Sequence, residues 1–436
     1  MKRLLGSWIF IITMVLIDLY VFQSLKLVTS SLSSKLRLGI HIAYWSFTAA
    51  AIILFLIIPY IQFEALPKFI RVYVIAILFG FFIAKFIAMI FFLVDDARRL
   101  LQWGGIKTYQ LVKGETSQTD AISRSLFLSW LGIGVGGSLF GALLYGFGNK
   151  YRYRIEKVRF RSGNIPTAFK GLKIVQISDI HSGSLDDLQA VKKGIEKIND
   201  LQPDVIFFTG DLVNNMAKEM EDRYFIFHFF TGDLVNNMAK EMEDKIAIFS
   251  SLKAPLGIYS ILGNHDYGDY VPWPNAEAKK DNLDSLKNIH AQMGWRLLLN
   301  EHIALEKGGA SIGVIGIENW GARANFAKYG DLKKAYQGAD QYPFKILLSH
   351  DPSHWDAEVC KHFSDIDLML SGHTHGMQFG VEIPGFRWSP VQYVYKQWGG
   401  LYKNGEQHLY VNRGFGFLGY PGRVGILPEI TLIELV

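Results

Sequence analysis

The sequence contains a single cysteine, Cys360, among 436 residues. One cysteine excludes an intrachain disulfide and any metal cluster built on several thiolates. A lone residue of this type is usually a small buried hydrophobe. A metal site in this chain must therefore use oxygen and nitrogen ligands, which carboxylate, amide and imidazole side chains supply.

The sequence also lacks a strong charge of either sign. Its 45 Lys and Arg residues oppose 40 Asp and Glu residues, for a net charge of +5. The basic residues gather beside apolar stretches, notably in NKYRYRIEKVRFR at 149–161. Such a cluster fits an anionic membrane surface better than a nucleic acid. We therefore expect membrane lipids as partners and no nucleic acid.

Long apolar runs, by contrast, are abundant before residue 150. Four stretches approach or exceed the roughly 20 residues needed to cross a bilayer. They lie at about 5–25, 38–63, 69–94 and 125–148. The pattern predicts an all-α, four-helix transmembrane domain over 1–150 and a basic juxtamembrane linker at 151–164. The first stretch lacks a small-residue cleavage site, so we expect a retained anchor and not a signal peptide.

The apolar stretches contain two charged residues and one glycine-rich segment, and each of these features has two interpretations. Asp18 and Lys85 are charges within the first and third stretches, and either they pair with each other or Lys85 reaches the membrane interface. GIGVGGSLFG at 132–141 matches G-x-G-x-x-G, but no strand precedes it. Close packing of helices is favoured over a dinucleotide site. A transporter would need more polar groups within the membrane.

The distribution of Lys and Arg beside the spans indicates the orientation. Ten lie in the segments on the same side as the amino terminus and eight in those on the other side. After four spans the carboxyl-terminal domain shares the side of the amino terminus. The difference favours a cytoplasmic position for that domain. We expect a protein of the bacterial inner membrane.

From about 165 to 436 the chain has an α/β pattern, in which short apolar runs end in polar loops and alternate with amphipathic helices. Five predicted strands end in SDIHSG, TGD, LGNHDYG, LLSHDP and SGHTHG. Because loops at the carboxyl ends of such strands converge on one crevice, we expect a shared metal site there. Its candidate residues are Asp179, His181, Asp211 or Asp233, Asn264, His265, His350, His373 and His375.

The ligand chemistry narrows the choice of metal. Carboxylate oxygen, amide oxygen and imidazole nitrogen suit divalent manganese, iron, zinc or cobalt, and two ions are needed to occupy so many ligands. His373 and His375 alternate along an extended chain, so their side chains diverge. They fit two neighbouring metals better than one.

The order of these motifs, D-x-H, G-D, G-N-H-D, a single His after a strand and G-H-x-H, resembles that of the calcineurin-like metallophosphoesterases over about 165–436. The resemblance implies a β-sandwich flanked by helices. NRGFGFLGYPGRVGILPEITLIEL at 412–435 is similar to the carboxyl-terminal motif of a membrane-attached bacterial branch that includes the YkuE-type enzymes. The four preceding spans resemble the transmembrane proteins with a metallophosphoesterase domain.

The resemblance also implies a role for each candidate residue. One metal is held by Asp179, His181 and His375, and the other by Asn264, His350 and His373. The Asp of the G-D motif bridges both ions, and His265 contacts phosphate and assists the leaving group. Two cations about 3.5–4 Å apart lower the pKa of a bridging water, and the resulting hydroxide attacks phosphorus. His265 can then protonate the departing alkoxide.

We therefore expect a membrane-anchored, metal-dependent phosphoric ester hydrolase. Its target would be a phosphomonoester, phosphodiester or pyrophosphate bond in a lipid-linked or envelope substrate. Related enzymes include one that acts on a UDP-diacylglucosamine precursor of lipid A, so lipid A biosynthesis is one candidate setting. The alternative is a non-catalytic, metal-binding membrane scaffold or sensor.

The segment FFTGDLVNNMAKEMED occurs at 207–222 and again at 229–244. We interpret this as a tandem duplication of 22 residues and not as a functional repeat array. The first copy completes PDVIFFTGD, a well-formed apolar strand, whereas the second must borrow RYFIFHFF. We predict that Asp211 bridges the metals and that the surplus residues bulge out before or within the next helix. The alternative is Asp233, with the first copy looped out.

One carboxyl-terminal segment also remains open to two interpretations. Its basic and aromatic side chains either line the substrate entrance or pack as a closing strand and loop. They are Arg413, Phe415, Phe417, Tyr420 and Arg423.

Overall fold

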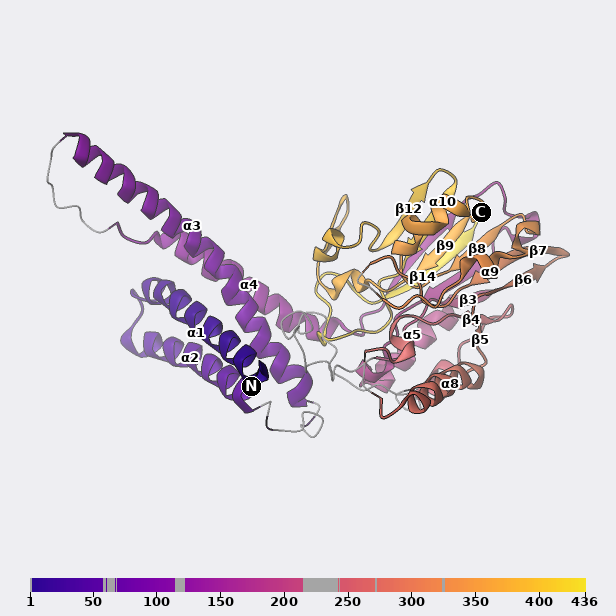
Figure 1. Ribbon diagram of the computed structural model, residues 1–436, viewed down its shortest axis with the longest axis horizontal. Helices are drawn as coiled ribbons and strands as arrows, with labels where there is room; N and C mark the ends of the chain where they lie inside the picture. Colours follow the sequence, from indigo (N-terminus) through magenta and orange to yellow (C-terminus); the bar gives the residue numbers. More distant parts are fainter. Residues whose placement is uncertain are drawn as a thin grey trace. The chain divides into compact units, whose positions relative to one another are not determined.

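The structure is a computed structural model, and it contains two compact units, Met1–Tyr145 and Gly146–Val436 (Figure 1). The first unit is helical. The second holds the strands that the structure describes. The residues described are 2–57, 60, 67, 69–113, 122–214, 242, 244–270, 273–323 and 326–436.

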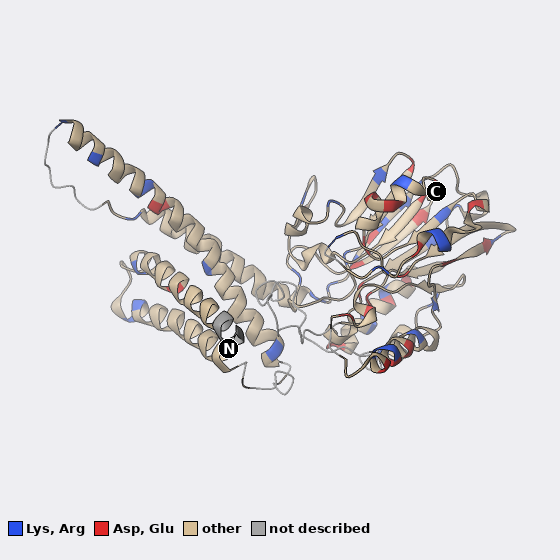
Figure 2. Ribbon diagram, viewed as in Figure 1, with Lys and Arg blue, Asp and Glu red and all other residues tan. Residues whose placement is uncertain are grey.

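Four long apolar helices form the first unit. They are α1 (Lys2–Val28), α2 (Ser34–Ile57), α3 (Ile75–Lys113), which a π-helical turn at Ile70–Val74 precedes, and α4 (Leu126–Gly146). Each is long and apolar enough to cross a membrane. Figure 2 shows that charged residues are sparse along most of their length. The predicted four-helix membrane domain is confirmed.

Helix α3 continues well past the predicted end near residue 94. The apolar run stops at Asp95 and Asp96, but both carboxylates pair with arginines one turn later, at 2.9 Å to Arg98 and 2.8 Å to Arg99. Ion pairs three residues apart support a helix, and the residues that follow have adequate helix propensity. The end of the apolar run therefore predicts the end of the apolar part of α3. It does not predict the end of the helix itself.

The charged residues inside the helices are paired. Lys85 forms an ion pair with Asp18, and both are buried. Thr48 donates a hydrogen bond of 2.7 Å to the Asp18 carboxylate, and Tyr44 donates one of 2.9 Å to the Asp18 carbonyl. A buried charge is tolerated when it is paired and hydrogen-bonded. The paired interpretation of Asp18 and Lys85 is confirmed.

The glycines of α4 allow it to lie close to α3. A Cβ on Gly136 would lie 2.5 Å from the carbonyl oxygen of Ala84, and one on Gly132 would lie 3.0 Å from that of Ala88. Only a small residue permits this approach. The glycine-rich sequence therefore serves helix packing, as predicted.

Two sheets form the centre of the second unit within the described residues. The first has the order β1-β14-β2-β3-β4-β5 and the second β12-β13-β9-β8-β7-β6. The strands of the first are β1 (Arg154–Phe160), β2 (Lys173–Ile177), β3 (Val205–Phe208), β4 (Ile258–Ser260), β5 (Arg296–Leu297) and β14 (Glu429–Leu435). Those of the second are β6 (Glu301–Lys307), β7 (Ala310–Gly316), β8 (Lys345–Leu348), β9 (Leu368–Ser371), β12 (Gly400–Asn404) and β13 (Gln407–Val411).

Side-chain alternation along the strands explains the layers. In β3, Val205 and Phe207 join the core between the two sheets, whereas Ile206 and Phe208 point to the outer face of the first sheet. That face is covered by α5 (Leu188–Asp200), α7 (Ile246–Phe249) and α8 (Ala276–Gln292). The second sheet packs against α9 (Leu332–Tyr336) and α10 (Cys360–His362) (Figure 1). The predicted sandwich flanked by helices is confirmed.

The segment expected as a basic linker, 151–164, contains an ordered strand instead. β1 runs parallel to β14, from Arg154 opposite Glu429 to Phe160 opposite Leu435. Phe160 is buried between the sheets, whereas the basic residues of the strand are at least partly exposed. Alternation of basic and apolar residues is what an edge strand requires, so composition alone misled the prediction.

Candidate metal centre

Within their sheets, β2, β3 and β4 run parallel to one another, as do β8 and β9, and their carboxyl ends carry the predicted site residues. Asp179 and His181 follow β2, Asp211 follows β3, and Asn264 and His265 follow β4. The remaining three, His350, His373 and His375, follow β8 and β9. Asp233, the alternative to Asp211, lies outside the described residues.

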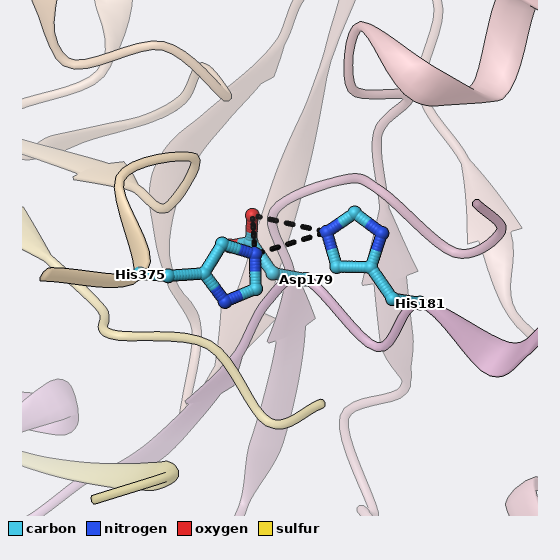
Figure 3. Close-up of side chains that lie close together, drawn as sticks. All are labelled: Asp179, His181 and His375. Carbon is cyan, nitrogen blue, oxygen red and sulfur yellow. Dashed lines mark hydrogen bonds and ion pairs between the residues drawn. The ribbon is translucent and has the colours of Figure 1, made fainter. Parts of the chain in front are cut away.

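One group of side chains consists of Asp179, His181 and His375, all buried (Figure 3). The Nε2 atoms of the two histidines lie 2.9 Å apart. His375 Nε2 lies 3.3 Å from Asp179 Oδ1, and His181 Nε2 lies 3.9 Å from the same oxygen. Three donor atoms thus converge on one point.

The second group consists of Asp211, His350 and His373. Asp211 Oδ2 lies 3.1 Å from His350 Nε2, and His373 Nδ1 lies 3.3 Å from the same nitrogen. The same Asp211 oxygen also lies 3.7 Å from His181 Nε2 in the first group. Asp211 therefore faces both groups at once.

Asn264 and His265 lie next to this pair of groups. The backbone N–H of His265 donates to Asp211 Oδ1 at 2.9 Å, and the His265 ring lies 5.1 Å from that of His181, measured between centroids. Asn264 Nδ2 donates to Tyr270 at 3.1 Å. Its Oδ1 is buried and has no hydrogen-bond partner among the described residues. A buried oxygen of this kind is costly unless something else binds it, and a metal cation is a chemically suitable partner.

The backbone of the site adopts conformations that side chains other than glycine rarely take. Positive φ angles occur at Asp179 (52°), His181 (44°), Asp211 (60°), His373 (71°) and His375 (49°). Each costs of order 1 kcal/mol or more and persists only where the surrounding structure enforces it. Such residues concentrate where side chains must be aimed at a common point.

The side chain of Asp266 holds part of this backbone in place. Its buried carboxylate accepts backbone hydrogen bonds from Asp211 (2.9 Å), Leu212 (2.8 Å), Val213 (3.2 Å) and Gly263 (2.8 Å). It therefore holds the loop after β3 against the loop after β4. The sequence motif LGNHDYG contains Asp266, but the sequence analysis gave it no role.

Burial and mutual interaction shift the pKa values of the carboxylates and imidazoles in the site. Burial disfavours the charged form of His350, but the neighbouring Asp211 carboxylate raises the pKa of this imidazole to about 10. Burial lowers the pKa of His181 to about 3. Burial also raises the pKa of Asp179 to about 6. Because metal ligands must be neutral imidazoles or ionised carboxylates, cation binding at this site would release protons from His350 and Asp179.

His373 is oriented by two residues that the sequence analysis missed. Its Nε2 lies 2.9 Å from the Tyr395 hydroxyl, which donates to Asp351 Oδ2 at 3.4 Å. Histidines that bind metals commonly use one nitrogen for the metal and the other for such a partner. With Nε2 engaged by Tyr395, Nδ1 is directed toward His350 and Asp211. Asp351 lies in the predicted motif LLSHDP, but no pattern linked distant Tyr395 to it.

The basic and aromatic segment near the carboxyl terminus packs into the domain and does not line an entrance. Phe415 and Arg423 have exposed fractions of 0%. Arg423 donates to the carbonyl oxygens of Arg413 (2.7 Å) and His375 (3.2 Å), and one of its nitrogens lies 3.2 Å from His375 Nδ1. Arg413 pairs with Glu382 and Glu429. The segment therefore supports the backbone around His375.

Comparison with known proteins agrees with this geometry. Residues 172–377 match the family profile described as calcineurin-like phosphoesterase. Residues 2–149 match the profile of a probable calcineurin-like phosphoesterase transmembrane domain. The chain therefore belongs to the calcineurin-like phosphoesterases, and it is a metal-dependent phosphoester hydrolase with a membrane domain.

Several curated proteins are similar to the chain over about two thirds of its length. An uncharacterized metallophosphoesterase of Bacillus subtilis, YkuE, is 31% identical over 68% of this chain and 92% of its own length. A transmembrane protein with metallophosphoesterase domain from Danio rerio is 29% identical, over 65% of this chain and 57% of its own. UDP-2,3-diacylglucosamine pyrophosphatase LpxG of Chlamydia trachomatis is 28% identical over 63% and 88%, respectively.

Proposed function

We propose that the protein hydrolyses a phosphoester bond of a lipid-linked substrate at a two-metal site. The observation that carries the proposal is the position of Asp211, whose Oδ2 lies 3.7 Å from His181 Nε2 in one ligand group and 3.1 Å from His350 Nε2 in the other. A carboxylate shared between two groups of nitrogen and oxygen donors suits two adjacent divalent cations.

The donor set assigns a place to each residue. Asp179, His181 and His375 would hold one ion, Asn264, His350 and His373 the other, and Asp211 both. Manganese, iron, zinc and cobalt all accept these ligands. When bound, a pair of such cations neutralises charge on phosphoryl oxygens and activates water for in-line attack. Tyr395 and Asp266 would then keep the ligands aimed, through His373 and the loop after β3.

His265 has the position of a proton donor for the leaving group. Its backbone is fixed by the hydrogen bond to Asp211, so its imidazole stays beside His181 and the two ligand groups. An imidazole that is not itself bound to a cation can protonate a departing alkoxide. Without that proton the leaving group would depart as a high-energy anion.

The presence of a membrane domain supports the proposal that the substrate is linked to a lipid. Enzymes anchored by spans of this kind stay where amphiphilic phosphoesters concentrate. A similar protein, LpxG, is named a UDP-2,3-diacylglucosamine pyrophosphatase. A pyrophosphate bond in a lipid A precursor is therefore one specific candidate, beside other phosphomonoesters and phosphodiesters of the envelope.

The surroundings of the spans support a location in the bacterial inner membrane with the catalytic unit in the cytoplasm. Lys and Arg number ten beside the spans on the side of both termini, against eight on the other. Short flanking segments rich in basic residues are retained on the cytoplasmic side.

One experiment tests the proposed function directly. Purified full-length protein is loaded with each metal in turn and assayed against phosphomonoesters, phosphodiesters and nucleotide-sugar lipids. The proposal expects metal-dependent turnover that is highest for a lipid-bearing class. Absence of turnover with every metal, in protein that binds two ions per chain, would instead leave a metal-binding scaffold.

A further inference from the structure

An excursion of the chain next to the metal centre exposes apolar residues. It leaves the site at His375, continues into the hairpin strands β10 (Val381–Ile383) and β11 (Phe386–Trp388), and passes a turn at Pro390–Tyr393. It then returns to Tyr395, whose hydroxyl lies 2.9 Å from His373 Nε2. The excursion thus begins and ends at the proposed metal site.

The hairpin has one apolar and one polar face. Val381 pairs with Trp388 and Ile383 with Phe386, whereas Glu382 pairs with Arg387 between them. Residues directly opposite each other in an antiparallel pair share a face, and successive residues alternate faces. One face therefore consists of four apolar side chains only.

The polar face is fixed to the domain. Glu382 accepts a hydrogen bond of 3.1 Å from Arg413 Nε, and the Arg387 guanidinium lies 5.0 Å from the centre of the Trp398 ring. Arg413 is itself buried and paired with Glu429. Since these contacts hold the polar face, the apolar face is directed away from the domain.

The apolar face is open to its surroundings. The exposed fractions are 59% for Ile383, 54% for Phe386 and 40% for Val381. Tyr393, which is 77% exposed, accepts a hydrogen bond of 3.4 Å from Trp388 and so extends this face. We call Val381, Ile383, Phe386, Trp388 and Tyr393 the apolar hairpin surface. A short two-stranded hairpin gains nothing from such a face in water, and a contiguous exposed apolar surface commonly marks a binding site.

We propose that the apolar hairpin surface inserts into the lipid headgroup region of the membrane that holds the helices. The same chain carries four candidate membrane spans, so its second unit remains beside a bilayer at all times. Trp and Tyr combine an apolar ring with a polar tip, which favours the boundary between headgroups and acyl chains. Exposed Lys396, three residues beyond Tyr393 in the chain, suits anionic headgroups.

A second copy of the chain fits this surface less well. Strands of three residues each offer only a small area, whereas stable interfaces between proteins bury about 800 Å² on each partner. Partial insertion into lipid needs no complementary partner surface. The size of the hairpin therefore favours the bilayer.

Insertion has a consequence for the site. Because the excursion starts at His375 and ends at Tyr395, a hairpin anchored in the headgroup region holds the metal centre beside that plane. Phosphoesters of lipids lie in the same region. This consequence rests on the proposed function, whereas the membrane contact itself does not.

A fluorescence experiment tests the contact in the full-length protein. In a Cys360→Ser background, Phe386→Cys is labelled with an environment-sensitive dye and reconstituted into vesicles of anionic lipids with brominated acyl chains. Glu406→Cys, between β12 and β13, is the matched control, because its side chain is 96% exposed. We expect a blue shift and loss of emission by bromine quenching at residue 386 and neither at residue 406.

The outcomes separate the alternatives. Equal emission at residues 386 and 406 in brominated and ordinary lipids would overturn the proposal. Protection of residue 386 without quenching, together with crosslinking between copies, would overturn it in favour of a dimer.

A second variant links the contact to catalysis. Ile383→Asp combined with Phe386→Asp should lower the ratio of turnover on a vesicle-embedded phosphoester to turnover on a soluble phosphodiester. Equal metal content in the variant shows that it has folded. If the unmodified protein hydrolyses neither substrate, the proposed function fails, but the quenching result still decides the membrane contact.

Discussion

Asp211 is the side chain on which the two ligand groups depend. Its Oδ2 faces both His181 and His350, and its Oδ1 accepts the backbone hydrogen bond of His265. The loop that carries it is held in a left-handed conformation by the carboxylate of Asp266. No other described carboxylate faces both groups in this way.

We therefore expect Asp211→Asn to lower metal content and to reduce turnover by about 100-fold or more, because the amide removes a negative charge shared by two cations. Asp233→Asn is the matched control, since Asp233 occupies the same position in the second copy of the duplicated segment. Metal analysis and kinetics of both variants measure the effect. An active Asp211 variant beside an inactive Asp233 variant would reverse the assignment.

His265 is predicted to affect chemistry without affecting metal binding. His265→Ala should keep both ions and lose about 10²- to 10⁴-fold in turnover, which is the usual contribution of a general acid. His350→Ala should instead lose metal. His362→Ala, at an exposed histidine of α10, should change neither quantity. Metal loss in the His265 variant would refute its role as proton donor.

Tyr395 is predicted to act through His373. Tyr395→Phe removes only the hydroxyl that lies 2.9 Å from His373 Nε2. We expect a metal affinity about 10- to 100-fold weaker at one of the two positions, because the imidazole loses the partner that orients it. A competition titration of both proteins with a chelator measures this. An unchanged titration would show that packing alone orients His373.

At the scale of secondary structure, the motifs that combine an apolar run with polar residues predicted candidate residues at strand ends, and the structure brings most of these residues into two neighbouring groups. This worked because β2, β3, β8 and β9 are short, buried and followed at once by the functional residues. What could not be predicted depends on contacts between distant segments. The left-handed backbone at Asp179 and Asp211, the contact from Tyr395 to His373 and the pairing of β1 with β14 all require the folded chain.

The duplicated segment yields a prediction at the same scale. In the described residues, the end of β3 at Phe207 and Phe208 and the loop to Asn214 come from the first copy, and α7 begins at Ile246, just after the second copy. Deleting 215–236 shortens the interval between Asn214 and Ile246 from 31 to 9 residues. Because 207–222 and 229–244 are identical, this deletion gives the same protein as removal of 207–228.

We expect the deletion variant to keep metal content and turnover, and to unfold at an unchanged or slightly higher temperature. A shorter connection costs less closure entropy, by about 0.6 kcal/mol for each halving of its length. Thermal unfolding and metal analysis of both proteins provide the test. Loss of metal from the shortened protein would show that the site depends on the second copy.

At the scale of the whole molecule, the two units differ in how their buried charged groups are stabilised. Among the described residues, the membrane unit buries the Asp18–Lys85 ion pair between apolar helices and pairs Asp95 and Asp96, midway along α3, with Arg98 and Arg99. The catalytic unit buries a cluster of carboxylates and imidazoles whose donor atoms suit divalent cations. The charges of the first arrangement are paired within the chain, whereas the second offers ligands to metal ions.

The proposed cytoplasmic orientation of the catalytic unit rests on the charges beside the spans, and it can be tested on intact cells. Six of the ten basic residues on the side of the termini lie in 149–161, directly after α4. Several are paired in the folded domain, such as Lys150 with Asp186 at 3.7 Å. Pairing does not weaken the argument, because acidic residues contribute little to orientation during insertion.

We therefore expect protease added to intact spheroplasts to leave residues 165–436 uncut, and to digest them only after lysis, as an antibody against a carboxyl-terminal tag would report. A cytoplasmic marker and a periplasmic marker in the same cells serve as controls. Digestion without lysis would place the metal centre on the outer face. The substrate would then have to be a lipid of the outer leaflet, and metals would be drawn from outside the cytoplasm.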